Sequence, residues 1–504
     1  MRGGWMKGAL WGAVALLSVA AMPHAVANIV APVAQPAPRT AVDEDLLPWH
    51  VEAPPPAGYD RRHAAEETMR HLKALVARDT QNPPGNERIT ADYFESVLSN
   101  VPGITTHVLD AGDGRANFIA RLSAVNPTGR PVLVMGHMDT VGADLSKWDS
   151  PPYEPTLRDG YLYGRGVIDD KGMLAAATTA LVAMADRRSE LTRDIVFLAT
   201  AAEEGGPEVG IVKVLEEHRE LLGDPEFALN EGGRVRIVDG AIQTVNVQTT
   251  EKIYYEVIAT AKGRSGHGSV PLPDNALAAL SRAMSRIHEW RRKVMLNDTT
   301  RGYFEGLLKI ETDRETKRDM TDLLSTNRMR SKAAAERLSE RNPAWNAVLR
   351  TAGAITIMEG GIRGNVIPSE GRAVINVRLV PGDDIMDVIE EMADEADEEA
   401  VTFELDGEVR VGPPVSPTDT ALYAAMESAA LEMSPGAVVL PYMSTGGTDG
   451  RSLRAIGIPT YGINPFPMAS MDELRMHGDN ERAPVPAIGW GTEYIYRVLA
   501  RVTE

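Results

Sequence analysis

The chain has 504 residues, and 52 basic against 71 acidic side chains give it a formal net charge of −19. This length exceeds the size at which a single hydrophobic core stops growing, so we expect at least two packed units. The negative charge argues against nucleic-acid partners, and the absence of cysteine excludes disulfides, a thiol nucleophile and zinc held by cysteine.

The first residues have the pattern of a secretory signal peptide. Two basic residues precede an apolar run over residues 8–22, and Ala25 and Ala27 follow in an A-x-A pattern. We predict a signal peptide over 1–27 and a periplasmic or secreted protein with no stable membrane span after cleavage. An uncleaved membrane anchor is the alternative, although the run is short for a bilayer span.

The next segments predict a linker and an α/β unit. Residues 28–57 are rich in Pro and Ala, which is typical of a linker. Apolar runs at 131–137 and 194–204 flank a helical stretch over 173–185, a pattern that indicates a mostly parallel sheet. We therefore predict the first part of a catalytic domain over 58–248, with active groups at the carboxyl ends of its strands.

The order of predicted strands and helices changes at residue 249. Strand, helix, strand, strand, helix, strand is the order of a split βαβ unit, which we predict over 249–411. A charged, mostly helical insertion interrupts it at 295–350. The α/β pattern resumes over 412–504, so the smaller α+β domain is predicted to be inserted into the larger one.

Several short motifs carry residues suited to metal chemistry. GHMDTV places His137 and Asp139 two apart at a strand end, where they share a face, and a metal-binding histidine needs an acceptor on its other ring nitrogen. A satisfied structural histidine is the alternative. GRGVIDDKG holds Asp169 and Asp170 among glycines that permit a tight turn, and a helix N-cap is the alternative there.

Paired glutamates follow. Glu203 and Glu204 close the second apolar run, where neighbouring strand residues point in opposite directions and can do different work. Solvated loop charges are the alternative. NEGG and MHGDNE add Glu231 and His477 in glycine-flanked loops.

The set as a whole predicts a metal centre. Histidines and carboxylates without cysteine are the donors that zinc, cobalt or manganese bind through nitrogen and oxygen. A carboxylate shared by two metals, with a histidine on each and a nearby glutamate base, activates water. We expect two divalent ions, with Zn²⁺ favoured and Co²⁺ or Mn²⁺ as alternatives.

The ordered motifs GHMDTV, GRGVIDDKG, ATAAEEGG, NEGG, GRSGHGS, NVIP and MHGDNE resemble the aminoacylase, carnosinase and glutamate carboxypeptidase family of two-metal peptidases. The resemblance spans about residues 65–500. It implies an α/β catalytic domain with an inserted lid and dimerisation domain. The 295–350 insertion is similar to the carboxypeptidase S and N-fatty-acyl amino-acid hydrolase branch.

The resemblance implies a role for each motif residue. Asp169 would bridge the metals, Glu203 would be the general base and Asp139 would orient a histidine. His267 would stabilise the oxyanion, often across a dimer. The remaining roles are metal ligands at His137, Glu204, Glu231 and His477, and substrate binding at Asn365, Arg378, Thr448 and Asp449.

The predicted function is hydrolysis of a peptide or N-acyl amide bond next to a free carboxylate, because Arg378 can bind a carboxylate bidentately. The substrate would be a small peptide or an N-acyl amino acid, and a homodimer through the lid is compatible with the family. An aminoacylase is the alternative within the enzyme class. An inactive peptide-binding protein of the same fold is the alternative outside it.

Overall fold

The computed structural model describes residues 51–410 and 412–504. The predicted signal peptide and most of the predicted linker lie outside this range, and residues 51–57 contain neither helix nor strand. Among the described residues, no helix combines the length and apolar character that a bilayer span needs.

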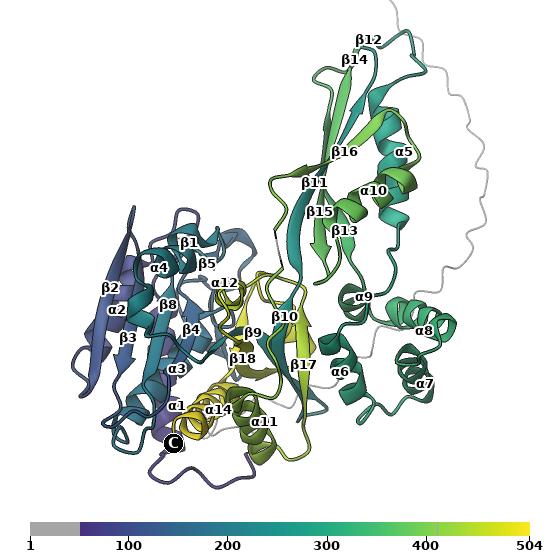
Figure 1. Ribbon diagram of the computed structural model, residues 1–504. Coiled ribbons are helices and arrows are strands. Elements are labelled where there is room, and N and C mark those ends of the chain that lie inside the picture. The colour runs from purple at the N-terminus through teal and green to yellow at the C-terminus, as the bar shows by residue number, and fades with distance from the viewer. Residues whose placement is uncertain (1–50, 411) are drawn as a thin grey trace, which may run out of the picture. The chain divides into compact units, whose positions relative to one another are not determined.

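A mixed, mostly parallel sheet forms the first unit (Figure 1). Its strand order is β17-β10-β18-β9-β4-β8-β3-β2, and β4 runs parallel to both β8 and β9. The β2–β3 hairpin adds an antiparallel edge. The strands are β2 (Ile104–Gly112), β3 (Arg115–Leu122), β4 (Val132–His137), β8 (Ile195–Thr200), β9 (Phe227–Val238), β10 (Ala241–Glu251), β17 (Val438–Ser444) and β18 (Thr460–Met468).

Helices cover both faces of this sheet. Every residue of β4 is buried, and successive side chains enter different cores, with Val132 and Val134 in one and Leu133 and Met135 in the other. The first core is closed by α1 (Arg61–Val76), α2 (Arg88–Leu98), α3 (Lys171–Ala185), α11 (Ala421–Met433) and α14 (Val485–Thr503), and the second by α4 (Ile211–Glu217) and α12 (Gly450–Ala455). This confirms the predicted α/β class.

Short elements complete the loops at the edges of the sheet. They are β1 (Gln81–Asn82), which pairs with β5 (Thr140–Val141), the three strands β6 (Thr156–Arg158), β7 (Tyr161–Tyr163) and β19 (Arg482–Pro484), and the single turn of α13 (Ser470–Glu473).

A separate antiparallel sheet forms the inserted α+β unit. Its order is β13-β15-β11-β16, and α5 and α10 pack against it around a core of their own. The elements follow the predicted order: β11 (Ile253–Lys262), α5 (Ala276–Glu289), β13 (Ala352–Gly360), β15 (Glu370–Leu379), α10 (Ile385–Ala396) and β16 (Val401–Asp406). A two-stranded extension pairs β12 (Gly266–His267) with β14 (Val366–Ile367). The domain boundaries themselves stay predictions.

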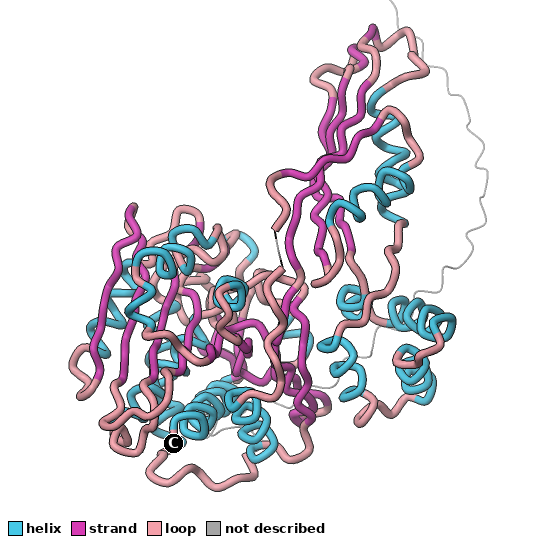
Figure 2. The backbone as a smooth tube through the Cα atoms, viewed as in Figure 1, coloured by secondary structure: helices cyan, strands magenta, loops and turns pink. Residues whose placement is uncertain are grey.

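The helical insertion consists of α6 (Asp298–Leu307), α7 (Arg314–Leu323), α8 (Arg328–Arg341) and α9 (Pro343–Leu349), which appear in Figure 2 as helices joined by loops. Helix α6 packs on β17. Gly306 lies so close to that strand that a Cβ atom there would overlap the side chain of Leu440. The insertion is therefore docked tightly on the edge strand of the large sheet.

Candidate metal centre

Asp169 lies between two histidines. Its Oδ1 is 2.9 Å from Nε2 of His137, and its Oδ2 is 3.0 Å from Nε2 of His477. His137 ends β4, Asp169 lies in the turn before α3, and His477 lies in the loop between α13 and β19. Gly166 in the turn has a φ of +84°, which explains the need for glycine there.

Glu204 joins this cluster. Its Oε1 is 2.9 Å from Nε2 of His477, and His137, Asp169 and Glu204 each offer a ligand atom within 4.8 Å of the others. Three side chains that the sequence predicts as metal ligands therefore lie close enough to bind one ion.

Glu231 approaches the cluster from β9. The sequence predicted a glycine-flanked loop, but Glu231 lies within the strand, where it is 8% exposed. The glycines instead serve an irregular strand, because Gly232 has a φ of +123° and the pairing of β9 with β18 shifts register here. Burial, followed by repulsion from Asp169, raises the pKa of Glu231 to about 8.

Asp139 holds the paired glutamates by their backbone. Its Oδ1 accepts a hydrogen bond from the N–H of Glu203 at 3.0 Å, and its Oδ2 accepts one from Glu204 at 3.1 Å. The prediction that these glutamates close the strand was wrong, because β8 ends at Thr200 and the chain turns. The different placement of the two side chains comes from this turn.

Asn82 is a contributor that sequence reasoning missed. Its Nδ2 donates to Oδ2 of Asp139 at 2.8 Å, and its Oδ1 accepts from Arg115 at 2.8 Å. The residue lies in the polar segment QNPPGNE, residues 81–87, which carries no metal-binding motif.

The two neighbouring aspartates have different surroundings. Asp170 is fully buried and its Oδ2 accepts a hydrogen bond from the backbone N–H of His137 at 3.3 Å, whereas Asp169 faces both histidines. This geometry supports Asp169 as the shared ligand.

The cluster carries an excess of buried negative charge. Burial raises the pKa of Glu203 well above its usual range, and Asp449, Glu231 and Glu204 add repulsion. Hydrogen bonds with Asp169 and Glu204 raise the pKa of His477 to about 10. Cations would relieve this crowding of carboxylates.

The residues fit divalent metal ions. Oε1 of Glu204 is buried and accepts no hydrogen bond of good geometry, although His477 is adjacent. Imidazole and carboxylate donors, without thiolate, suit zinc, cobalt or manganese.

Glu481 is a second missed contributor. Its carboxylate accepts hydrogen bonds from the backbone N–H groups of Gly166 at 3.0 Å, Ile168 at 2.8 Å and Asp169 at 3.3 Å. It also pairs with Arg165 at 2.8 Å, and both side chains are buried. Glu481 therefore fixes the turn that presents Asp169. Glu481 is the last residue of MHGDNE, the motif that also contains His477.

His267 and Asn365 lie together on the inserted unit. β12 pairs with β14, and the N–H of Gly268 donates to the carbonyl of Asn365 at 2.8 Å. Both side chains are exposed, and Nδ1 of His267 is 2.7 Å from Oγ of Ser269. They occupy the extension at one end of the antiparallel sheet (Figure 1).

Arg378 lies near the opposite end of β15. Its Nε donates to Oδ1 of Asn376 at 3.0 Å, and its guanidinium lies 4.8 Å from the ring centre of Tyr254. From Glu370 to Arg378 the strand extends roughly 25 Å at about 3.3 Å per residue. Asn365, which precedes β14, and Arg378 therefore lie at opposite ends of the inserted sheet.

Thr448 and Asp449 are buried, and their side chains form hydrogen bonds with other residues of the protein. Oγ1 of Thr448 donates to Glu251 at 2.8 Å, and Oδ2 of Asp449 accepts from Oγ1 of Thr200 at 2.7 Å. Burial raises the pKa of Asp449 to about 6. Their predicted role in substrate binding stays a prediction.

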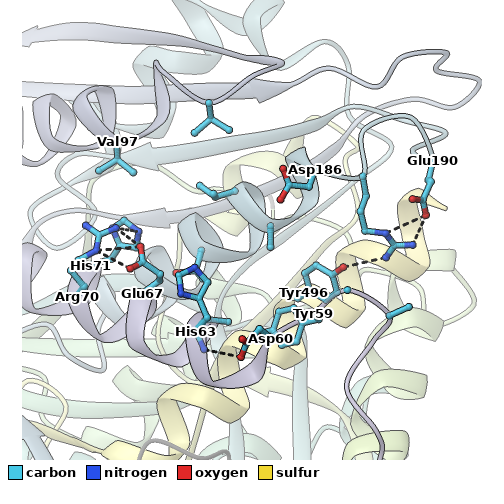
Figure 3. Close-up of a pocket in the computed structure, with 18 residues that line it drawn as sticks. Tyr59, Asp60, His63, Glu67, Arg70, His71, Val97, Asp186, Glu190 and Tyr496 are labelled. Carbon is cyan, nitrogen blue, oxygen red and sulfur yellow. Dashed lines mark hydrogen bonds and ion pairs between the residues drawn. The ribbon is translucent and has the colours of Figure 1, made fainter.

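A hollow of about 630 Å³ lies elsewhere, among α1, α2, α3 and Tyr496 of α14 (Figure 3). Four of its charged side chains form two pairs, because Arg70 donates to Glu67 and Arg187 donates to Glu190 and also to the hydroxyl of Tyr496. No residue of the metal cluster lines it. The cluster, and not this hollow, is therefore the catalytic candidate.

The fold and the cluster define a metal-dependent hydrolase of the amide-cleaving class. The chain belongs to the peptidase family M20/M25/M40, whose family model matches residues 133–501. It is a metallopeptidase or amidohydrolase of this family, of the carboxypeptidase or dipeptidase type.

Two curated relatives illustrate the similarity. The "N-fatty-acyl-amino acid synthase/hydrolase PM20D1" of Xenopus tropicalis is 30% identical over 367 residues, which cover 71% of this chain and 70% of that protein. The "Probable carboxypeptidase S-like 2" of Dictyostelium discoideum is 27% identical over 399 residues, covering 76% and 75%.

Solved structures confirm the fold. A metallo-carboxypeptidase, Sso-CP2 from Sulfolobus solfataricus, superimposes with a TM-score of 0.63 at 18% identity and covers 86% of this chain and 99% of its own. The YXEP protein of Bacillus subtilis, described as a dinuclear metal binding peptidase, gives a TM-score of 0.56 at 15% identity, covering 88% and 100%. The predicted family and fold class are thus confirmed.

Proposed function

We propose that this protein hydrolyses a peptide or N-acyl amide bond next to a free carboxylate, using two divalent metal ions. The observation that carries the proposal is the carboxylate of Asp169 held between His137 and His477, with the half-buried Glu203 nearby. Zn²⁺ is the favoured ion, and Co²⁺ and Mn²⁺ suit the same donors.

The metal ligands would come from both sequence portions of the large unit, before and after the inserted unit. They are His137, Asp169, Glu204, Glu231 and His477. Metal ions bound there would supply Lewis-acid polarisation of the scissile carbonyl and would acidify water.

Glu203 moves the proton. Burial and nearby carboxylates raise its pKa, which makes its carboxylate form a stronger base. That carboxylate would accept a proton from the attacking water and deliver it to the leaving nitrogen. Asp139 fixes the backbone that carries Glu203, since it accepts hydrogen bonds from the N–H groups of Glu203 and Glu204.

The substrate carboxylate would be bound by Arg378. Because His267 and Asn365 lie at the other end of the inserted sheet, we propose that they serve the active site of a second copy in a homodimer. Light scattering coupled to size exclusion measures the dimer directly. Mixing an inactive His267→Ala protein with an inactive Glu203→Gln protein should then restore part of the activity, because one hybrid site has both residues intact.

The substrate class has two candidates. Dipeptides or carboxyl-terminal residues fit the carboxypeptidase and dipeptidase type. N-acyl amino acids are favoured by the name of the Xenopus tropicalis relative. Two exposed apolar side chains also favour them, Met471 and Leu474, which are 71% and 75% exposed on and just after α13. These lie within six residues of His477 in the chain, so an acyl chain could contact them.

The decisive assay compares both substrate classes on purified protein. A series of N-acyl amino acids of increasing chain length is run beside dipeptides, with and without chelator. We expect hydrolysis that disappears on chelation and returns with Zn²⁺. Turnover of neither class would refute the proposed function and would favour an inactive binding protein.

We also propose that the protein is exported to the periplasm or secreted. The support is the basic, apolar and A-x-A order of the first 27 residues. Fractionation of the native host, with sequencing of the mature amino terminus, tests this. A protein that begins at Asn28 is expected, and retention of the full leader in the cytoplasmic fraction would contradict export.

A further inference from the structure

Glu251 is a buried carboxylate at the end of β10, two residues before β11 begins the inserted unit. It is 2% exposed and has four hydrogen-bond donors. Oε1 accepts from the N–H of Thr448 at 3.1 Å. Oε2 accepts from Oγ1 of Thr448 at 2.8 Å, Nε2 of Gln248 at 2.9 Å and Nη2 of Arg454 at 2.6 Å.

These contacts join segments that are far apart in the chain. Thr448 is 197 residues from Glu251, and Arg454 is 203 residues away. Arg454 is itself 2% exposed and belongs to α12. A buried ion pair of this kind is costly to break, because the remaining charge loses its partner. The segment from Thr448 to Arg454 is therefore fixed to the end of β10.

The fixed segment reaches the proposed catalytic centre at two points. Asp449, next to Thr448, accepts a hydrogen bond at 2.7 Å from Thr200, which ends β8 just before the turn of Glu203. On the other side, Gln248 and Thr448 both pack against Gly232, which follows Glu231. A Cβ atom at Gly232 would overlap the Gln248 amide, so this approach is close.

We propose that Glu251 is a positioning residue for the reaction. Its four hydrogen bonds go to Thr448, Gln248 and Arg454, and not to a residue of the metal cluster. It holds Thr448 and Gln248 directly, and Asp449 through Thr448, so that the turn after β8 and the Glu231 segment of β9 keep their spacing. This inference rests on the proposed hydrolase function, because it assigns a role in that reaction.

The test is Glu251→Gln in the full-length protein, with Glu493→Gln as a matched control. Glu493 is a fully buried glutamate of α14. It pairs with Arg61 of α1 and with Arg497 of α14. Misplacement of catalytic groups by about 1 Å can cost about 100-fold in rate. We expect Glu251→Gln to lower kcat by about 10- to 100-fold, with KM changed less and metal content retained at saturating Zn²⁺. Glu493→Gln should keep kcat within about twofold, even at an equal loss of Tm.

A second pair of variants decides the matter if Glu251→Gln does not fold. Arg454→Met keeps an unbranched side chain but removes the charge that pairs with Glu251, and Arg454→Lys keeps a positive charge. We expect a lower kcat for the methionine variant and near wild-type kcat for the lysine variant. Equal kcat in wild type, Glu251→Gln and Arg454→Met would overturn the positioning role while leaving the hydrolase intact. An inactive wild-type protein would overturn both.

Discussion

At the scale of single residues, neighbouring side chains of the same type have different surroundings. Asp169 faces two histidines while Asp170 binds the backbone of His137. Glu204 approaches His477, whereas the strongly raised pKa of Glu203 suits a proton carrier. The different surroundings decide the roles, since the side chains themselves are identical.

Glu203→Gln tests the proton carrier. General acid–base groups typically contribute about 100- to 10 000-fold, so kcat should fall by about that factor. Metal content, measured by inductively coupled plasma mass spectrometry, should stay at the wild-type value. Glu208→Gln, an exposed neighbour, is the control and should retain activity. Loss of metal together with activity would place Glu203 among the ligands.

His71 makes stability depend on pH. It is 2% exposed, and burial followed by repulsion from Arg70 lowers its pKa from 6.5 to about 4. As the pH falls below 6.5, the unfolded chain binds a proton that the folded protein does not, so stability is lost until about pH 4. The loss can reach about 3 kcal/mol at 1.36 kcal/mol per pKa unit.

The measurement is urea unfolding of wild type and His71→Gln between pH 7 and pH 4. The variant should show a shallower decline across this window. His63→Gln on the same helix provides the control, because His63 is exposed. Equal slopes for wild type and His71→Gln would contradict the assigned cause.

At the scale of elements, carboxylates bind loop backbones and thereby place other side chains. Asp139 holds the turn after β8, and Glu481 holds the turn before α3. The backbone of these two turns is therefore fixed at, or next to, the residues that carry the proposed ligands.

Glu481→Gln should weaken metal binding without removing a ligand. Groups that orient metal ligands typically contribute about 10- to 100-fold in affinity, and we expect a loss in that range. Competition with a chromogenic chelator measures it. Asp319→Asn, which disrupts the ion pair of the buried Asp319 with the partly exposed Arg337 in the helical insertion, should leave metal affinity unchanged. An unchanged affinity in Glu481→Gln would show that the turn holds its shape by itself.

Gly306→Ala tests the docking of α6 on β17. Alanine favours a helix over glycine by about 1 kcal/mol, but its Cβ would overlap the buried Leu440 side chain. Overpacking costs about 1 to 3 kcal/mol, so we expect a net loss of about 1 kcal/mol in the free energy of unfolding. Gly436→Ala, whose added Cβ meets open space, is the comparison in the same urea titration. A stabilised Gly306→Ala protein would mean that α6 and β17 are loosely packed.

At the scale of the whole molecule, the cluster ties distant parts of the chain together. Asp169 is 32 residues from His137 and 308 residues from His477. Metal bound by these residues therefore links the two portions of the large unit, and its free energy of binding adds to that of folding.

Removal of metal should lower Tm. A ligand present at 100 times its Kd stabilises the folded state by about 2.7 kcal/mol. Calorimetry with chelator, and again after addition of Zn²⁺, should show a reversible shift that grows with Zn²⁺ concentration. His477→Ala should reduce this shift, whereas His107→Ala on β2 should not. A Tm independent of metal would argue against a site in the folded protein.

The sequence by itself predicted the α/β sheet, the inserted βαβ unit, the helical insertion and the side chains that lie at the cluster, because periodicity and motif order are local properties. It misplaced Glu231 in a loop and Glu203 at a strand end, since strand limits depend on pairing partners. Only the tertiary structure revealed Glu481, Asn82 and Glu251, and it separated Asn365 from Arg378. Hydrogen bonds across hundreds of residues and the length of a strand are set by packing, which no local pattern encodes.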